Sequence, residues 1–252
     1  HPELLDWLAV EFRKQGLSLK KLHRLIVTSS TYRQSSQASP ALLARDPQNR
    51  LLARGPRFRL SGELIRDHML MASGLLSTKM YGPGVYPPQP ASVTALAWGN
   101  TRWNVSKGED RFRRSIYTFS KRTAPFAGYL TFDGTSGEGC VARRNRSNTP
   151  LQALTMLNDE MYLELARATG QSAHKDAKDP VFSIFRKFLT RHPQANERKS
   201  LQSFLDQQTE RLRKGELKPE LITGKKNASP EEAGCVLLAR VIMNLDETIT
   251  KP

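Results

Sequence analysis

Residues 149–167, TPLQALTMLNDEMYLELAR, carry the clearest structural signal in the chain. Thr149 suits the N-cap of a helix, Pro150 suits the first helical position, and Gln152 stands where a capping box places its returning side chain. The apolar residues that follow recur at helical spacing: Leu154, Leu157, Met161 and Leu165. We therefore predict one long helix over this stretch, with its apolar face in a hydrophobic core.

Similar spacing predicts two short amphipathic helices at the start of the chain. The first should begin at Pro2 and end near Gly16, and the second should follow the N-cap Ser18 with its apolar stripe buried. The two should pack as a helical hairpin. The polar stretch 28–59 should be irregular surface structure with one helical turn near Leu42.

Helices should also make up most of the remaining chain. One is expected after Ser61, and a polar linker is expected at 170–179. Three apolar runs then predict a C-terminal helical lobe: 181–189, 201–212 and 236–241.

The best strand signal lies at 113–121, where β-branched and aromatic residues alternate with period two. The preceding segment, 81–90, is rich in Gly and Pro and should be an extended loop. The predicted fold class is therefore mainly α: a helical domain with a small β element near 113–122 and a C-terminal helical lobe.

The positive charge of the chain is unevenly distributed. The chain has 252 residues and a formal net charge of +15. Residues 1–150 hold 23 Lys and Arg against 10 Asp and Glu, whereas residues 151–252 hold 16 against 14. Such a field attracts nucleic acid, acidic polysaccharide, anionic lipid or an acidic protein without selecting among them. The alternative is a solvated surface that favours solubility.

The densest polar segment, residues 132–150, predicts an anion site. Its glycines loosen the backbone, and it ends at a helix N-terminus, whose free amides favour anions. The expected anion-binding residues are Arg143, Arg144, Asn148, Lys121 and Arg122, with Asp133, Cys140 and Asn145 in support. The alternative is that Arg143, Arg144 and Asn148 bond internally, with Asp133 as an obvious partner, and brace the loop.

The remaining motifs give no support for nucleotide binding, metal binding or serine acyl transfer. The phosphate-binding signature GxxxxGK[ST] is absent, and no second His or carboxylate accompanies His68 at metal-ligand spacing. Ser18 and Lys21 spell SxxK, but Ser before a helix is usually a cap. Cys140 and Cys235 should be partly buried free thiols, with a disulfide as the alternative. No apolar run is long enough for a membrane span, and the first residues lack the pattern of a signal peptide.

A series of short motifs resembles a known family along nearly the whole chain. Each occurs in the expected order: residues 1–9 (HPELLDWLA), residues 23–36, Ile65-Arg66-Asp67, Gly82-Pro83-Gly84-Val85, Arg113-Arg114-Ser115-Ile116-Tyr117, Lys121-Arg122, Phe132-Asp133, Arg143-Arg144, residues 148–154 (NTPLQAL), Leu157-Asn158-Asp159 and Asn244-Leu245-Asp246-Glu247. In these motifs the chain is similar to the planctomycete-specific C-terminal domain of unknown function, which often accompanies planctomycete cytochrome c domains.

The resemblance implies an exported parent protein in the periplasm or at the cell surface, since c-type haem is attached outside the cytoplasm. It also implies that residues 1–169 form the basic core of this domain, shortened at its N-terminus, and that 170–252 form its C-terminal helical lobe. The haem-attachment motif CxxCH is absent here. We therefore expect no cofactor in this chain, with haem only in a separate cytochrome domain.

Several functions remain open at this stage. The leading hypothesis is a non-catalytic binding module for an acidic polysaccharide or a cytochrome domain. A second is an enzyme that acts on an anionic, sulfated carbohydrate, with Arg143 and Arg144 positioning the anion and Asp133 or His23 as acid or base. A third is nucleic-acid binding, which an exported setting disfavours, and a fourth is a purely structural lobe.

Overall fold

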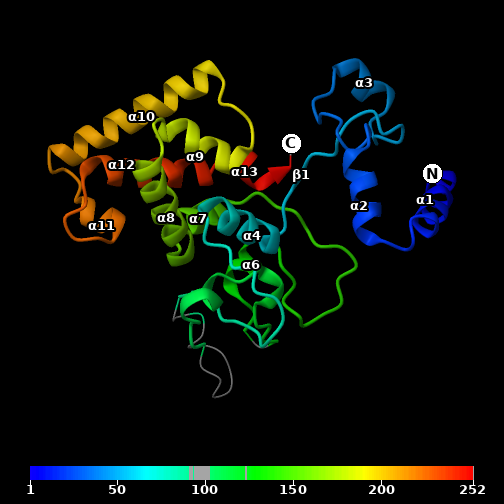
Figure 1. Ribbon diagram of the computed structural model, residues 1–252, viewed down its shortest axis with the longest axis horizontal. Helices are drawn as coiled ribbons and strands as arrows, with labels where there is room; N and C mark the ends of the chain where they lie inside the picture. Colours follow the sequence, from blue (N-terminus) through cyan, green and yellow to red (C-terminus); the bar gives the residue numbers. More distant parts are fainter. Residues whose placement is uncertain (91–92, 94–102, 123, 252) are drawn as a thin grey trace. The chain divides into compact units, whose positions relative to one another are not determined.

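The computed structural model describes residues 1–90, 93, 103–122 and 124–251 and confirms a mainly helical fold (Figure 1). Two 3-10 helices, η1 at Gly108–Phe112 and η2 at Ser115–Tyr117, and two short strands, β1 at Phe58–Arg59 and β2 at Thr250–Lys251, accompany the α-helices. The α-helices with described bounds are α1 Pro2–Lys14, α2 Leu19–Thr28, α3 Pro40–Arg45, α4 Gly62–Ser73, α6 Ala127–Thr131, α7 Pro150–Asn158, α8 Glu160–Asp176, α9 Pro180–Leu189, α10 Ala195–Arg213, α11 Pro219–Thr223, α12 Pro230–Met243 and α13 Asp246–Ile249.

The described chain divides into two compact units. Unit 1 comprises residues 1–58 and 251–252, and unit 2 comprises residues 59–250. The predicted division at residue 169 stays a prediction, although α8 runs without interruption through that position.

Unit 1 contains α1, α2 and α3 at the expected places. The Ser18 hydroxyl accepts a hydrogen bond from the Lys21 amide, so Ser18 is the predicted cap. The expectation of a buried stripe is wrong, because α1, α2 and α3 contain no buried residue. Several of their apolar side chains instead line a groove and remain partly exposed.

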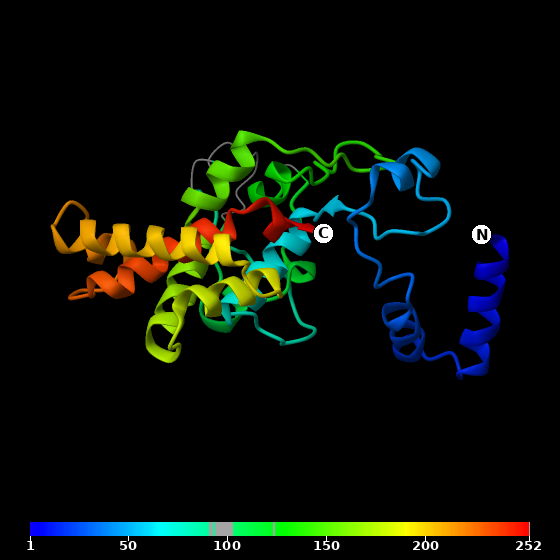
Figure 2. The same cartoon turned by 90° about the horizontal axis from the view of Figure 1, so that it is seen from above.

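The core of unit 2 lies among its long helices. The most extensive contacts are those of α8 with α12, and the views of Figure 1 and Figure 2 both show these helices side by side. Gly170 of α8 makes this approach possible, since a Cβ there would stand 2.5 Å from the Cα and N of Val236. The core also takes in α4 and α9 through Ile65, Met69 and Phe185.

The predicted single helix over 149–167 is two helices. Asp159 has an extended backbone and ends α7, and its carboxylate then accepts a hydrogen bond from the Met161 amide as the N-cap of α8. Because Asp competes well for an N-cap, the chain restarts there instead of continuing the helix. α8 then runs to Asp176, so most of the linker predicted at 170–179 is helical.

The strand predicted at 113–121 does not form. The segment contains η2, and only isolated bridges join Arg113 to Ser77 and Thr118 to Val85. The segment around Val85 is rich in proline, which lacks the amide needed for a ladder, so pairing stops at single bridges. The two-stranded sheet pairs β1 with β2 instead.

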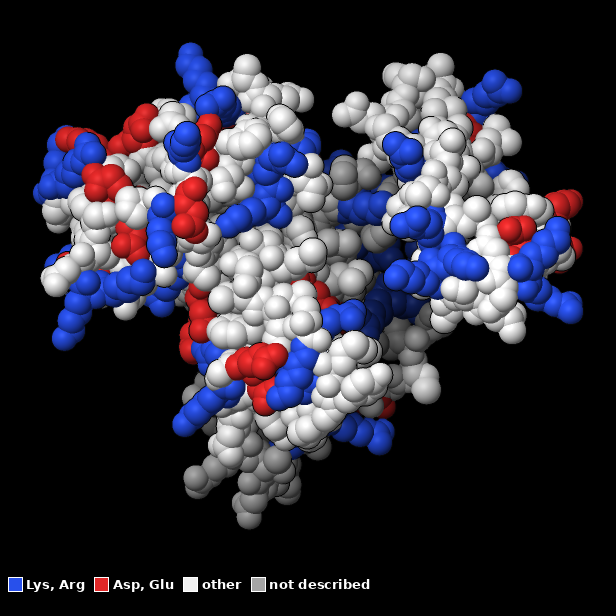
Figure 3. Space-filling model, in the orientation of Figure 1, with Lys and Arg blue, Asp and Glu red and all other residues white. Residues whose placement is uncertain are grey.

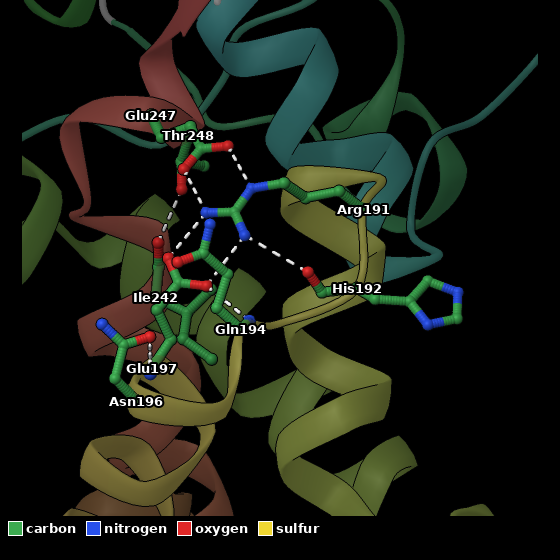
Figure 4. A network of polar contacts seen from close by, with 8 residues as sticks. All are labelled: Arg191, His192, Gln194, Asn196, Glu197, Ile242, Glu247 and Thr248. Carbon is green, nitrogen blue, oxygen red and sulfur yellow. Dashed lines mark hydrogen bonds and ion pairs between the residues drawn. The ribbon is translucent and has the colours of Figure 1, made fainter.

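A polar network fastens the C-terminal helices of unit 2 to one another (Figure 4). The Arg191 guanidinium, just after α9, donates to both carboxylate oxygens of Glu197 at 2.7 and 2.8 Å and to both of Glu247 at 2.6 Å. Glu197 also accepts from the Gln194 amide at the start of α10. These contacts raise the pKa of Arg191 and lower that of Glu197. The network therefore joins the end of α9 to α10 and α13.

Candidate anion-binding site

A cavity of about 260 Å³ lies where β1, the start of α4, the end of α6 and the start of α7 meet the polar loop. We call it the arginine cavity, because four arginines line it. Its lining residues are Arg59, Leu60, Ser61, Phe132, Asp133, Arg143, Arg144, Asn145, Arg146 and Gln152. The structure therefore brings together Asp133, Arg143, Arg144 and Asn145, four of the residues that the sequence singled out.

Asp133 fixes the shape of the cavity wall. Its backbone adopts a positive φ of 61°, a conformation that Asp tolerates better than most residues. Its carboxylate accepts hydrogen bonds from the Ser147 amide at 2.7 Å and from the Ser147 hydroxyl at 2.8 and 2.9 Å. Asp133 thus braces the loop through Ser147, and not through an arginine as the sequence suggested.

Gln152 is one of the residues around the cavity and is fully buried, with 0% of its surface exposed. Its side-chain amide donates to the Thr131 carbonyl at 3.1 Å and to the Ser147 hydroxyl at 3.2 Å. It does not return a bond to Thr149, so the predicted capping box is wrong, although Thr149 does accept from the Gln152 backbone amide. The Gln152 Oε1 atom accepts no hydrogen bond from any described residue.

Arg144 is held by an ion pair across the cavity rim. Its Nη1 donates to both carboxylate oxygens of Glu63, at 2.8 and 2.9 Å. Burial raises the pKa of Glu63, but hydrogen bonds from its own amide and from Arg144 outweigh burial, so this pKa lies below the ordinary value. Arg144 also lines a neighbouring cavity of about 270 Å³ together with Glu63, Phe126 and Tyr129. For Arg144 the geometry matches the bracing alternative.

Arg143 differs from the other arginines of the cavity. Its side chain is exposed and makes no hydrogen bond or ion pair with any residue that the structure describes. By contrast, Arg59 donates to Asp246 at 3.0 Å, and Arg146 interacts with another residue. Arg143 is therefore the cation of the cavity with all its donors available.

The remaining predicted residues do not line the arginine cavity. This group comprises Lys121, Arg122, Cys140 and Asn148. The Lys121 ammonium is buried and meets no hydrogen-bond partner among the described residues, and Arg122 lies close to Gly137 of the polar loop. Cys140 is a free, exposed thiol, and is thus more accessible than expected. His23 is exposed on α2 in unit 1 and is not one of the lining residues.

Sequence reasoning missed three of the lining residues that matter. Arg59 and Arg146 stood in polar segments without a distinguishing pattern, and Gln152 was interpreted as a helix cap. A signal for Gln152 did exist. It is a polar residue on the inner face of a helix, where a long amide needs partners from other segments.

Unit 2 also contains a second group of arginines, which we call the buried arginine cluster: Arg66 and Arg113 with the residues that they contact. Arg66 is 1% exposed and donates to the carbonyl oxygens of Arg113 at 2.7 Å and Arg111 at 3.2 Å. Burial lowers its pKa. Asp67 accepts from the Ser115 amide at 2.7 Å, which ties α4 to η2.

Arg113 is equally buried and holds the Gly- and Pro-rich loop in place. It donates to the carbonyl oxygens of Lys79, Tyr81 and Pro83, and its guanidinium lies 3.7 Å from the centre of the Tyr117 ring. These contacts use the motif residues at 65–67, 82–85 and 113–117, so that part of the sequence pattern serves the fold.

The family of the chain follows from a match over most of its length. A model described as PSD1, protein of unknown function (DUF1553), matches residues 1–205. The chain belongs to this family. A search of curated proteins and a search of solved structures each found no significant match.

The PSD1 match confirms the predicted membership of a family of unknown function and contains every residue that lines the arginine cavity. It ends within α10, so α11, α12 and α13 lie outside it. The link to planctomycetes and to cytochrome domains stays a prediction.

Within the ranges that the structure describes, no group of three or more His, Cys, Asp or Glu is placed to hold a metal ion. His68 is a packed residue, as expected, with Nε2 at 3.1 Å from the Phe188 carbonyl oxygen. None of the described helices combines the length and hydrophobicity that a membrane span requires.

Proposed function

We propose that the chain is a non-catalytic binding module whose arginine cavity holds an acidic carbohydrate. The observation that carries the proposal is the pairing of Arg143, a cation with free donors, with the buried and unsatisfied Oε1 of Gln152 in one cavity. A guanidinium recognises a carboxylate or sulfate through paired donors. A buried carbonyl oxygen without a donor is costly and favours a ligand that supplies one.

Arg143 and the Gln152 oxygen together favour a ligand that carries both an anionic group and a hydroxyl. Inorganic sulfate pairs with Arg143 but has no donor for the Gln152 oxygen, whereas a neutral sugar can donate to Gln152 but offers Arg143 no negative charge. A uronic acid or a sulfated sugar satisfies both. The volume of about 260 Å³ lies just below the range of drug-sized ligand pockets, which begins at about 300 Å³, so we expect the cavity to take one sugar residue and not a longer stretch of a chain.

Binding is favoured over turnover because the nearby carboxylates already have structural partners. Asp133 accepts from the amide and the hydroxyl of Ser147, and Glu63, beside the cavity, accepts from Arg144 with both carboxylate oxygens. Glycoside hydrolysis generally needs two carboxyl groups that face the substrate. Asp133 is the one acidic residue among those that line the cavity in the described structure. An exported setting, which the resemblance implies, would bring the module into contact with acidic polysaccharides.

The test is binding of a sulfated disaccharide, glucose, inorganic sulfate and a DNA duplex, each measured by calorimetry over a salt series. The wild type should bind the disaccharide best. Arg143→Gln should weaken this binding about tenfold or more, as expected for a hydrogen bond to a charged group. Arg122→Gln is the matched control, because Arg122 lies near the same loop but outside the cavity.

A second variant tests the role of the Gln152 oxygen. Gln152→Met should narrow the preference for the disaccharide over inorganic sulfate, provided that its unfolding curve shows a folded protein. Equal affinity for every polyanion, with no effect of Arg143→Gln, would refute the proposal. Release of sulfate or of a reducing end by the wild type would replace it with the enzymatic alternative.

A further inference from the structure

Unit 1 contains a second concave site, independent of the arginine cavity. It is a groove of about 590 Å³ whose exposed lining is mostly apolar. The lining residues come from α1, α2 and the segments around α3, and β2 adds one: Leu4, Trp7, Leu8, Leu25, Ile26, Ser29, Thr31, Tyr32, Gln48, Asn49, Leu52, Arg54, Pro56 and Lys251. We call it the apolar groove.

The groove leaves large side chains in contact with water. Leu4, Trp7 and Tyr32 are 45%, 51% and 48% exposed, and no residue of α1, α2 or α3 is buried. A contiguous apolar surface of this kind marks an interaction site more often than scattered apolar residues do. Its concave form suits a side chain that enters it, whereas membrane insertion uses apolar groups that project outward.

The charged residues that line the groove indicate the charge of its partner. Arg54 and Lys251 line it, and no Asp or Glu does. Arg54 donates to the carbonyl oxygens of Asp46 and Pro47. A hydrogen bond from the Leu51 amide lowers the pKa of Asp46, and the charge of Arg54 helps to lower it. The Lys251 ammonium lies 4.4 Å from the centre of the Tyr32 ring. Among the described residues, neither side chain forms a salt bridge with a carboxylate.

The surrounding unit is basic as well. Unit 1 contains 11 Lys and Arg against 4 Asp and Glu. Three of the four acidic residues lie on α1, whereas α2 carries Lys20, Lys21 and Arg24 and no acidic residue, as the blue surface over α2 in Figure 3 reflects.

We propose that the apolar groove binds an acidic amphipathic helix of a partner protein. Apolar residues at i, i+3 or i+4, and i+7 of that helix would fill the groove, as in other complexes where a helix lies in a groove. Its Asp and Glu residues would face Lys251, Arg54 and the basic residues of α2. Complementary charge of this kind sets the choice of partner and the rate of association.

The probe is a labelled 18-residue peptide with Leu at i, i+3, i+4 and i+7 and Glu at the flanking positions. Fluorescence anisotropy measures its affinity for the full chain, and a scrambled peptide of the same composition serves as control. The designed peptide should bind at least about tenfold more tightly than the scrambled one, which lacks an apolar face.

Two neighbouring leucines of α1 provide a matched pair of variants. Leu4 lines the groove, whereas Leu5 is 69% exposed and does not. Leu4→Glu should weaken peptide binding about tenfold or more, because it places a carboxylate in an apolar site that faces an acidic partner. Leu5→Glu should change it less than about twofold. Lys251→Gln should weaken binding and flatten its salt dependence.

The proposal would be overturned if the designed and scrambled peptides bound with equal affinity. It would also be overturned if Leu4→Glu and Leu5→Glu weakened the binding of the designed peptide equally. A third result would overturn it as well: the wild type does not bind the peptide but does bind vesicles of phosphatidylglycerol and phosphatidylcholine, and Leu4→Glu abolishes the vesicle binding. That pattern would assign the groove to membranes. Peptide-independent dimerisation that Leu4→Glu abolishes would assign it to a second copy of the chain.

Discussion

The arginine cavity and the buried arginine cluster draw on the same residue type in the same unit and use it in opposite ways. In the cluster, Arg66 and Arg113 are 1% exposed and direct their donors to backbone carbonyl oxygens. In the cavity, Arg143 is exposed and has no partner among the described residues, and Arg144 lies between these extremes with one ion pair. The positive charge of a chain therefore overstates the cations available to a ligand, because internal acceptors occupy some of them.

The largest expected effect comes from the buried cluster. Arg113→Met should lower the free energy of unfolding by about 3 kcal/mol, because it leaves the carbonyl oxygens of Lys79, Tyr81 and Pro83 without their donor. Urea unfolding monitored by circular dichroism measures this change. A decrease of less than about 1 kcal/mol in the free energy of unfolding would show that Arg113 does not stabilise the fold more than the arginines of the cavity do.

An intermediate effect is expected at Asp133, which shapes the cavity. Asp133→Ala should cost about 1 to 2 kcal/mol, since it removes the acceptor of the Ser147 amide and hydroxyl. It should also weaken binding of the sulfated disaccharide, because the loop that carries Arg143 is no longer held. Asp133→Asn is the control: it keeps an acceptor and tolerates the positive φ, so its unfolding curve should stay close to that of the wild type.

A smaller effect is expected for the ion pair of Arg144 with Glu63. Both side chains are partly exposed, so Arg144→Gln should cost only about 0.5 kcal/mol. Because the folded-state pKa of Glu63 lies below its ordinary value of 4.5, its contribution is present above that pH and is lost as the pH falls through the folded-state pKa. The stability difference between wild type and Glu63→Gln should therefore shrink from pH 7 to pH 3 in thermal unfolding. A constant difference would show that the pair does not stabilise the fold through charge.

The smallest effect on stability, and the largest on binding, is expected at Arg143. Arg143→Gln should change the free energy of unfolding by less than about 0.5 kcal/mol, as for other exposed residues without partners. The same variant should lose most of the affinity for the sulfated disaccharide. A marked destabilisation would place Arg143 with the bracing residues instead.

The sequence predicted the helices better than the site, for a physical reason. Helical periodicity and caps are local, so the positions of α1, α2, α9 and α12 follow from a few neighbouring residues. The break at Asp159 was also local, and the run Asn158-Asp159-Glu160 contained its signal, but the apolar periodicity on either side concealed it.

The roles of the individual arginines depend on contacts that local patterns do not encode. Arg113 receives its acceptors from residues about 30 positions earlier, and Arg144 receives Glu63 from 81 positions earlier. Nothing in the neighbourhood of either residue separates the one that braces the interior from the one at the cavity rim. The sequence could therefore name the polar loop as the site and could not say which of its cations was available.

The two cysteines differ in exposure, so a thiol reagent should modify one of them selectively. Cys235 is buried in α12, and burial raises its pKa to about 11, so its reactive thiolate is scarce at neutral pH. Cys140 is exposed on the loop that supplies Arg143 and Arg144 to the arginine cavity. A maleimide dye applied to the folded protein should therefore attach at a single position and report when that loop meets its ligand.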